Sequence, residues 1–168
     1  MPGKYCISNG MTLIELVTVI LVIGILAVIA VPRFFSSTAF NASGYFQTTL
    51  AAVRYAQKLA LTSDCDIRVT INSSGFQLHQ WNNGTACTAG VSAPMDVSRP
   101  GSSDAFAEAP PEGVSITGTL SLYFDGIGRP HDAGSGTLLG SPVSVTIGGR
   151  DLTIENETGY TRCTVGCS

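Results

Sequence analysis

Five cysteines and two histidines are the side chains of this sequence that could act as nucleophiles, bind a metal or form cross-links. The cysteines are Cys6, Cys65, Cys87, Cys163 and Cys167. Their spacings do not form two short Cys-x-x-Cys arms, and no histidine lies near either pair, which disfavours zinc. His79 and His131 belong to no recognisable catalytic motif. The sequence therefore predicts no enzyme activity, no metal site and no cofactor.

A calcium site in the loop from Asp125 to Asp132 is a minor alternative. That loop carries acidic side chains, but it lacks the carboxylate spacing of an EF-hand. We therefore do not expect calcium binding there.

The last four cysteines form an even set if Cys6 is removed with a leader peptide. In an oxidising compartment, four cysteines form two disulfides in one of three connectivities. A hairpin expected over residues 66–81 would place Cys65 opposite residue 82, and the polar run that follows can bring Cys87 back. We therefore favour Cys65 with Cys87, and a local bridge between Cys163 and Cys167. A crossed pattern, which would staple the C-terminal tail to the first hairpin, stays open.

The segment Met11 to Val31 is 21 residues long, carries Glu15 as its one charge and is followed by Pro32. As a helix it would cover about 32 Å, which matches the hydrocarbon core of a bilayer. A secretory signal peptide is the alternative, but its apolar region spans about 7 to 15 residues and ends at an Ala-x-Ala-like site. We expect residues 11–31 to form a single membrane span.

Glu15 needs a partner, because a carboxylate at membrane depth costs about 2.5 to 3.5 kcal/mol. No cation lies within the span, and Lys4 and Arg33 lie beyond its two ends. A free amine at Met11 would stand one helical turn from Glu15, and it could also serve a neighbouring helix. Such an amine requires cleavage of the ten residues that precede Met11.

The sequence Gly10-Met-Thr-Leu-Ile-Glu15 resembles the prepilin-peptidase site of type IV pilins and type II secretion pseudopilins. The resemblance implies cleavage between Gly10 and Met11, N-methylation of Met11, and pairing of Glu15 with a neighbouring subunit's amine in the filament. Gly24 and Pro32 fall where helices of this family carry a Gly and a Pro, so the helix is expected to melt or bend there.

The same resemblance implies partners and a location. The expected partners are a prepilin peptidase, other major and minor pilins, and an inner-membrane assembly platform. The expected location is the inner membrane, with one span and a periplasmic C-terminal head, and afterwards a pilus or pseudopilus.

Hydrophobic periodicity predicts a long N-terminal helix followed by β-strands. Together with the resemblance it implies a pilin-like α+β fold, in which a long N-terminal membrane-spanning helix packs on an antiparallel β-sheet head. The expected segments are a leader peptide over 1–10, a helix over 11–63 and a β-rich head over 64–168. Strands are predicted at 66–71, 76–81, 113–117, 119–124, 142–147 and 150–155. Residues 83–112 hold four of the eight prolines and no sustained period. We expect them to form a long surface loop in which partner recognition varies.

Two further stretches resemble the H-type (GspH/FimT-like) branch of minor pilins and pseudopilins. They are Ala51-Ala-Val-Arg-Tyr-Ala-Gln-Lys-Leu-Ala60, which leads directly into a predicted strand, and Tyr123-Phe-Asp-Gly-Ile-Gly-Arg-Pro130. The resemblance implies a minor pilin that takes part in the assembly, initiation or tip of an adhesive, MSHA-like pilus. The alternative is an H-type minor pseudopilin of type II secretion.

A head that captures DNA or a glycan is a less favoured interpretation. The net charge is −3, and the arginines beyond the predicted helix are fewer than the acidic residues of the same region. DNA binding relies on clustered cations, so we expect no nucleic-acid partner.

Overall fold

The computed structural model describes residues 11–34, 37–81, 87 and 94–167. Two compact units make up the chain, Met1–Ser37 and Thr38–Ser168. The helix predicted over 11–63 corresponds to α1 (Leu13–Phe34) and α2 (Ser37–Ser63), and residues 35–36 between them lie outside the described part.

The first unit contains α1, whose start is set by Thr12. The Thr12 carbonyl accepts hydrogen bonds from the backbone amides of Glu15 and Leu16, both at 3.1 Å, and its hydroxyl also accepts from the Glu15 amide. This is the arrangement of an N-cap, which satisfies the first free amides of a helix. The large apolar side chains from Met11 to Leu26 are exposed. Within the described residues, none of the helices meets both the length and the apolarity that crossing a membrane requires.

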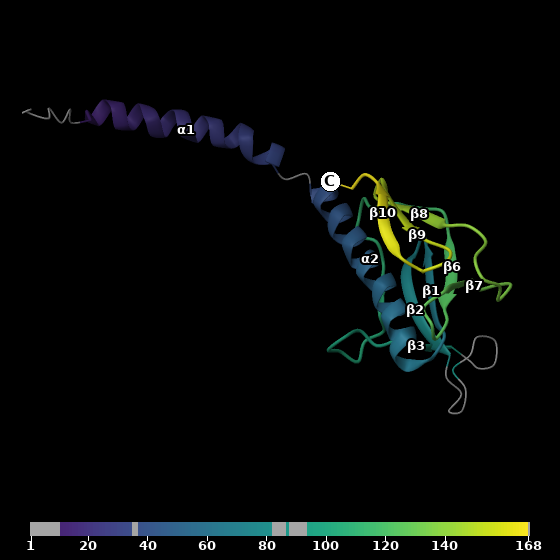
Figure 1. Ribbon diagram of the computed structural model, residues 1–168. Helices are drawn as coiled ribbons and strands as arrows, with labels where there is room; N and C mark the ends of the chain where they lie inside the picture. The colour runs from purple at the N-terminus through teal and green to yellow at the C-terminus, as the bar shows by residue number, and fades with distance from the viewer. Residues whose placement is uncertain (1–10, 35–36, 82–86, 88–93, 168) are drawn as a thin grey trace, which may run out of the picture. The chain divides into compact units, whose positions relative to one another are not determined.

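The second unit contains α2 and two antiparallel sheets, and Figure 1 shows α2 lying against them. The first sheet has the order β3-β2-β1-β6-β7, with β4 also paired to β2, and the second has the order β10-β9-β8-β5. The strands are β1 (Ile67–Asn72), β2 (Gly75–Trp81), β3 (Pro94–Asp96), β4 (Ala107–Glu108), β5 (Ile116–Thr117), β6 (Leu120–Phe124), β7 (Pro130–Asp132), β8 (Val143–Ile147), β9 (Arg150–Ile154) and β10 (Thr161–Val165). The predicted α+β class is confirmed.

Alternation along β1 builds the centre of the core. Ile67, Val69 and Ile71 are fully buried, and they belong to one core cluster with Phe46 and Val53 of α2. The residues between them in β1 are only partly buried, because successive side chains of a strand point to opposite faces. The core therefore lies between α2 and the inner faces of the sheets.

The hairpin predicted at residues 66–81 is confirmed by antiparallel pairing of β1 with β2, from Ile67 opposite Gln80 to Asn72 opposite Gly75. The Asn72 side-chain oxygen accepts a hydrogen bond from the Ser74 amide at 2.8 Å, which fixes the turn. Gly75 has a φ of +127°, and a Cβ at this position would collide with the Glu108 carbonyl. Both conditions require glycine.

The prediction of a long surface loop over 83–112 is wrong for residues 94–108. There β3 and β4 both pair with β2, and an isolated bridge joins Ser98 to Ala105. We call residues 94–108 the arm. Its Val97 and Phe106 side chains are only 5% and 8% exposed and belong to the core.

The strands of the arm could not be predicted from hydrophobic periodicity, for a physical reason. Its strands are three and two residues long, and they are held by main-chain pairing with β2, which needs no apolar alternation in the arm itself. Residues 83–86 and 88–93 of the predicted loop lie outside the described residues.

Candidate functional site

The start of α1 carries the residues of the predicted processing and assembly site. Gly10 lies outside the described residues, and Met11 is 67% exposed. Glu15 lies in the first turn of α1 and is exposed. Its carboxylate forms no hydrogen bond or ion pair with any residue that the structure describes. Pairing of Glu15 with an amine stays a prediction.

Gly24 and Pro32 both lie within α1. A Cβ built at Gly24 would meet no atom within 4 Å, so no packing contact among the described residues explains a glycine there. Only the backbone of Pro32 is described, and it lies two residues before the end of the helix at Phe34. Melting or bending at these two residues stays a prediction.

Two disulfides close the head, and both pairs are the ones favoured from the sequence. Cys65 and Cys87 are joined with their Cα atoms 4.6 Å apart, and the Asp66 amide donates a 2.8 Å hydrogen bond to the Cys87 carbonyl. This bridge ties the junction of α2 and β1 to the segment after β2. The other disulfide joins Cys163 and Cys167 across a separation of 4 residues and closes the end of β10.

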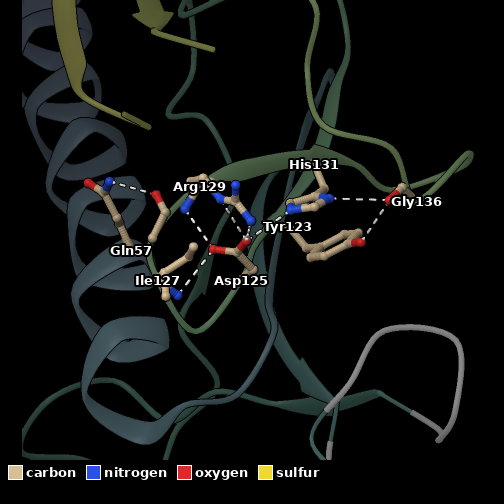
Figure 2. Close-up of polar contacts among 8 residues, drawn as sticks. Gln57, Tyr123, Asp125, Ile127, Arg129, His131 and Gly136 are labelled. Atoms are coloured by element: carbon tan, nitrogen blue, oxygen red, sulfur yellow. Dashed lines mark hydrogen bonds and ion pairs between the residues drawn. The ribbon is translucent and has the colours of Figure 1, made fainter. Parts of the chain in front are cut away.

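The segment Tyr123–Pro130, which resembles the H-type branch, forms a polar cluster centred on Asp125 (Figure 2). One oxygen of the Asp125 carboxylate accepts hydrogen bonds from the backbone amides of Ile127 and Arg129, at 3.1 and 2.8 Å. The other oxygen lies 3.3 Å from the Arg129 guanidinium and 3.0 Å from Nε2 of His131. These contacts use both oxygens, which leaves the carboxylate poorly placed to bind calcium.

The electrostatics of Asp125 follow from these contacts. Burial alone would raise the pKa of the Asp125 carboxyl, but hydrogen bonds from two backbone amides and His131, together with the Arg129 charge, hold the pKa below its ordinary value of 3.8. In the part of the chain that the structure describes, no group of three or more His, Cys, Asp or Glu side chains could hold a metal ion.

His131 and Tyr123 extend the cluster to β7. Their rings stack with centroids 4.9 Å apart, and the Tyr123 hydroxyl donates to the Gly136 carbonyl at 3.2 Å. The second ring nitrogen of His131 lies 3.2 Å from the same carbonyl. Burial raises the pKa of Tyr123, and the negative charges of Asp66 and Asp125 raise it further, so its hydroxyl remains a donor. The cluster holds β7 on β6 and shows no arrangement for catalysis.

Gln57 connects this cluster to α2. Its side-chain amide, labelled in Figure 2, donates to the carbonyls of Gly128 and Thr158 at 3.0 and 2.7 Å. Gly159 packs against the same amide and against the Gly128 carbonyl with no space for a Cβ. Sequence reasoning missed Gln57, because its partners lie 71 and 101 residues further along the chain.

Comparisons with known proteins bear on the class of the chain. No protein-family model matches it. The type IV narrow pilus major component PilA5 of Thermus thermophilus is 49% identical over 53 residues, which are 32% of this chain and 46% of that protein. The chain therefore spans about half the length of the curated relative that it matches. Among solved structures, the minor pseudopilin EpsH from the type 2 secretion system of Vibrio cholerae aligns with a TM-score of 0.47 and 14% identity, over 74% of this chain and 96% of that one.

Over those 53 residues the chain is a partial homologue of a Thermus type IV pilus component. By its name that relative is a major component of a type IV narrow pilus.

Proposed function

We propose that the chain is a minor type IV pilin subunit that is anchored by residues 11–31 in the inner membrane and carries its head in the periplasm. A prepilin peptidase cleaves it between Gly10 and Met11, and the new amine of Met11 is N-methylated. The observation that carries this proposal is the sequence Gly10-Met-Thr-Leu-Ile-Glu15 at the start of an apolar segment of 21 residues with a single charge.

The position of Glu15 supports an assembly role. Its carboxylate has no partner among the described residues, and the apolar side chains around it are exposed. An unpaired carboxylate among apolar side chains is costly in a lipid or protein interior. Pairing with the terminal amine of an adjacent subunit would remove that cost, so Glu15 would favour insertion of the subunit into a fibre beside other major and minor pilins.

For the kind of fibre, we propose an adhesive, MSHA-like pilus in which the chain acts in assembly, initiation or at the tip, as a counterpart of the minor pilin MshC. The support is the resemblance of residues 51–60 and 123–130 to the H-type branch. The same stretches also suit the alternative, an H-type minor pseudopilin of type II secretion. The neighbouring genes separate the two, since a secretion pseudopilin is encoded among components of a secretion channel.

The processing step is tested by the intact mass of the protein extracted from membranes of its native host. The expected product lacks Met1 to Gly10 and carries one methyl group on Met11. A Gly10→Glu variant, which alters only the residue before the cut, should keep its leader and accumulate in the membrane. Recovery of an uncleaved wild-type chain from assembled fibre would refute the proposal.

A further inference from the structure

A shallow groove lies at the end of the first sheet where β1 turns into β2. It has a volume of about 300 Å³ and is lined by side chains and backbone of β1, the turn, β2 and β4. Thr70 and Asn72 of β1 and Gln77 of β2 are at the strand positions that alternate with the buried Val69, Ile71 and Phe76. The groove therefore opens on the face of the sheet that points away from the core.

The groove contains neutral hydrogen-bonding groups whose capacity is not used. Thr70 and Gln77 stand directly opposite each other in the antiparallel register. In the described part of the chain, the Thr70 hydroxyl, the Gln77 amide and the Ser74 hydroxyl have no hydrogen-bond partner. Asn72 uses its oxygen to accept from the Ser74 amide, which leaves its NH2 group to donate. Unused donors and acceptors thus lie together in one groove.

The charge of the groove restricts its ligand. Glu108 is the one ionisable side chain among the described residues that line it. Its carboxylate is paired with the Arg99 guanidinium at 3.3 Å. Phosphate and nucleic acid bind to cationic side chains, and the residues that line the groove include no cation. A metal ion needs oxygen ligands, and the one carboxylate of the groove is already paired with Arg99.

The groove is also held rigid by the elements around it. β2 is paired on one side with β1 and on the other with β4. The Tyr45 hydroxyl of α2 donates a 2.9 Å hydrogen bond to the Glu108 carbonyl. Beneath the groove the Phe76 ring packs against the rings of Tyr45 and Phe106, at 6.1 and 5.8 Å between centroids. Binding of a ligand would therefore lose little conformational entropy in the groove.

We propose that this groove binds a neutral saccharide. Each sugar hydroxyl can both donate and accept a hydrogen bond. It therefore matches the amide and hydroxyl side chains of the groove, which also carry donors and acceptors: Thr70, Asn72, Ser74 and Gln77. The volume lies at the lower end of the range for small-molecule sites, about 300 to 1,000 Å³, and suits a short saccharide. The inference goes beyond the assembly role, because it concerns recognition by the head and makes no use of Glu15.

The test is a titration of the full chain, labelled with 15N, in a phosphocholine detergent that has no sugar headgroup. The probes are N-acetylglucosamine, galactose, mannose and their β-linked disaccharides, with inorganic phosphate and a neutral tripeptide as probes of other ligand classes. Saturable shifts at the backbone amides of residues 70–77 and 107–109 with at least one saccharide are expected.

Two variants link those shifts to the groove. Gln77→Ala and Thr70→Val should each weaken saccharide binding about fivefold, since each removes one hydrogen bond worth about 1 kcal/mol. Gln77 is exposed, so its replacement should leave the spectrum of a folded head. The matched control is Gln47→Ala, which removes an exposed glutamine of α2 and should leave the affinity unchanged.

The proposal is overturned if no saccharide produces these shifts at concentrations up to about 20 mM, well above the Kd of a millimolar site. It is overturned equally if the shifts persist unchanged in both groove variants. Shifts at the same amides with phosphate or the tripeptide and not with saccharides would assign the groove to another ligand class and reject the saccharide.

Discussion

Replacing Phe106 by Ala tests whether the arm is part of the core. The Phe106 side chain is 8% exposed, and its ring lies 5.5 Å from the ring of Tyr55 and 5.8 Å from that of Phe76. The Arg99 guanidinium also lies over the Phe106 ring, at 5.4 Å from its centroid. The substitution therefore removes a ring that packs against α2, β2 and its own arm.

The expected loss of stability is large. Truncation of a buried Phe to Ala costs about 3 to 5 kcal/mol, because apolar contacts are lost and a cavity remains. Aromatic pairs add about 0.5 to 1.5 kcal/mol beyond the buried area, so we expect the upper half of that range. Since small domains are stable by about 5 to 15 kcal/mol, the variant should melt at a much lower temperature.

The assay is thermal unfolding of the full chain, followed by near-UV circular dichroism. Phe40→Ala is the matched control: Phe40 is also a phenylalanine of the second unit, but it is 80% exposed, and its truncation should change stability by less than about 0.5 kcal/mol. If both substitutions lowered stability by an equally small amount, Phe106 would not belong to the core. The arm would then be a surface loop, as the sequence predicted.

Three further predictions concern the contacts that join distant parts of the head. Replacing Cys65 and Cys87 together by Ala opens a loop of 22 residues, and in the chain-entropy model it should lower the free energy of unfolding by about 3 kcal/mol, as measured by thermal unfolding. A non-reducing peptide map of the wild-type chain that links Cys65 or Cys87 to a C-terminal cysteine would contradict the pairing. Gln57→Leu removes two hydrogen bonds to carbonyls and should lower the free energy of unfolding by about 1 to 3 kcal/mol. Amide hydrogen exchange should become faster at residues 125–129 and 155–160, and unchanged exchange there would show that Gln57 does not hold the two turns. Asp125→Asn tests pH dependence: the folded-state pKa of Asp125 lies below its unfolded value near 3.8, so its stabilising effect is complete above that value and is lost as pH falls through the folded pKa. The stability gap between wild type and Asp125→Asn should therefore narrow as pH falls below the unfolded-state value of 3.8, and a gap that stays constant with pH would show that the carboxylate charge is not what matters.

The elements that could be predicted from the sequence are those whose signal is local. The hairpin from Ile67 to Trp81 was predictable because β1 alternates strictly, β2 alternates over its first half, and the two strands enclose a Gly-containing turn. The Cys65–Cys87 pair followed from the register of that hairpin. The helical character of residues 13–34 was predictable from their run of apolar residues, although the Thr12 cap that begins α1 was not foreseen.

The contacts that could not be predicted join residues with no shared local pattern. Asp125 and His131 are six residues apart, but they meet only because β6 turns back into β7. Gln57 looks like any polar residue of an amphipathic helix, and nothing near it in sequence indicates that two carbonyls face it. Long-range hydrogen bonds of this kind depend on topology, which composition and periodicity do not encode.

The arm shows why a segment without periodicity can serve stability and recognition together. Phe106 points into the core, while Glu108, two residues on, has its carboxylate paired with Arg99 and lines the groove. Replacing the whole arm by a flexible linker would remove a core ring and a wall of the groove at once, so such a deletion could not distinguish the two roles. Point substitutions can: Phe106→Ala should lower the melting temperature of the head, whereas Gln77→Ala, on the exposed side of β2, should lower saccharide affinity and leave the melting temperature nearly unchanged.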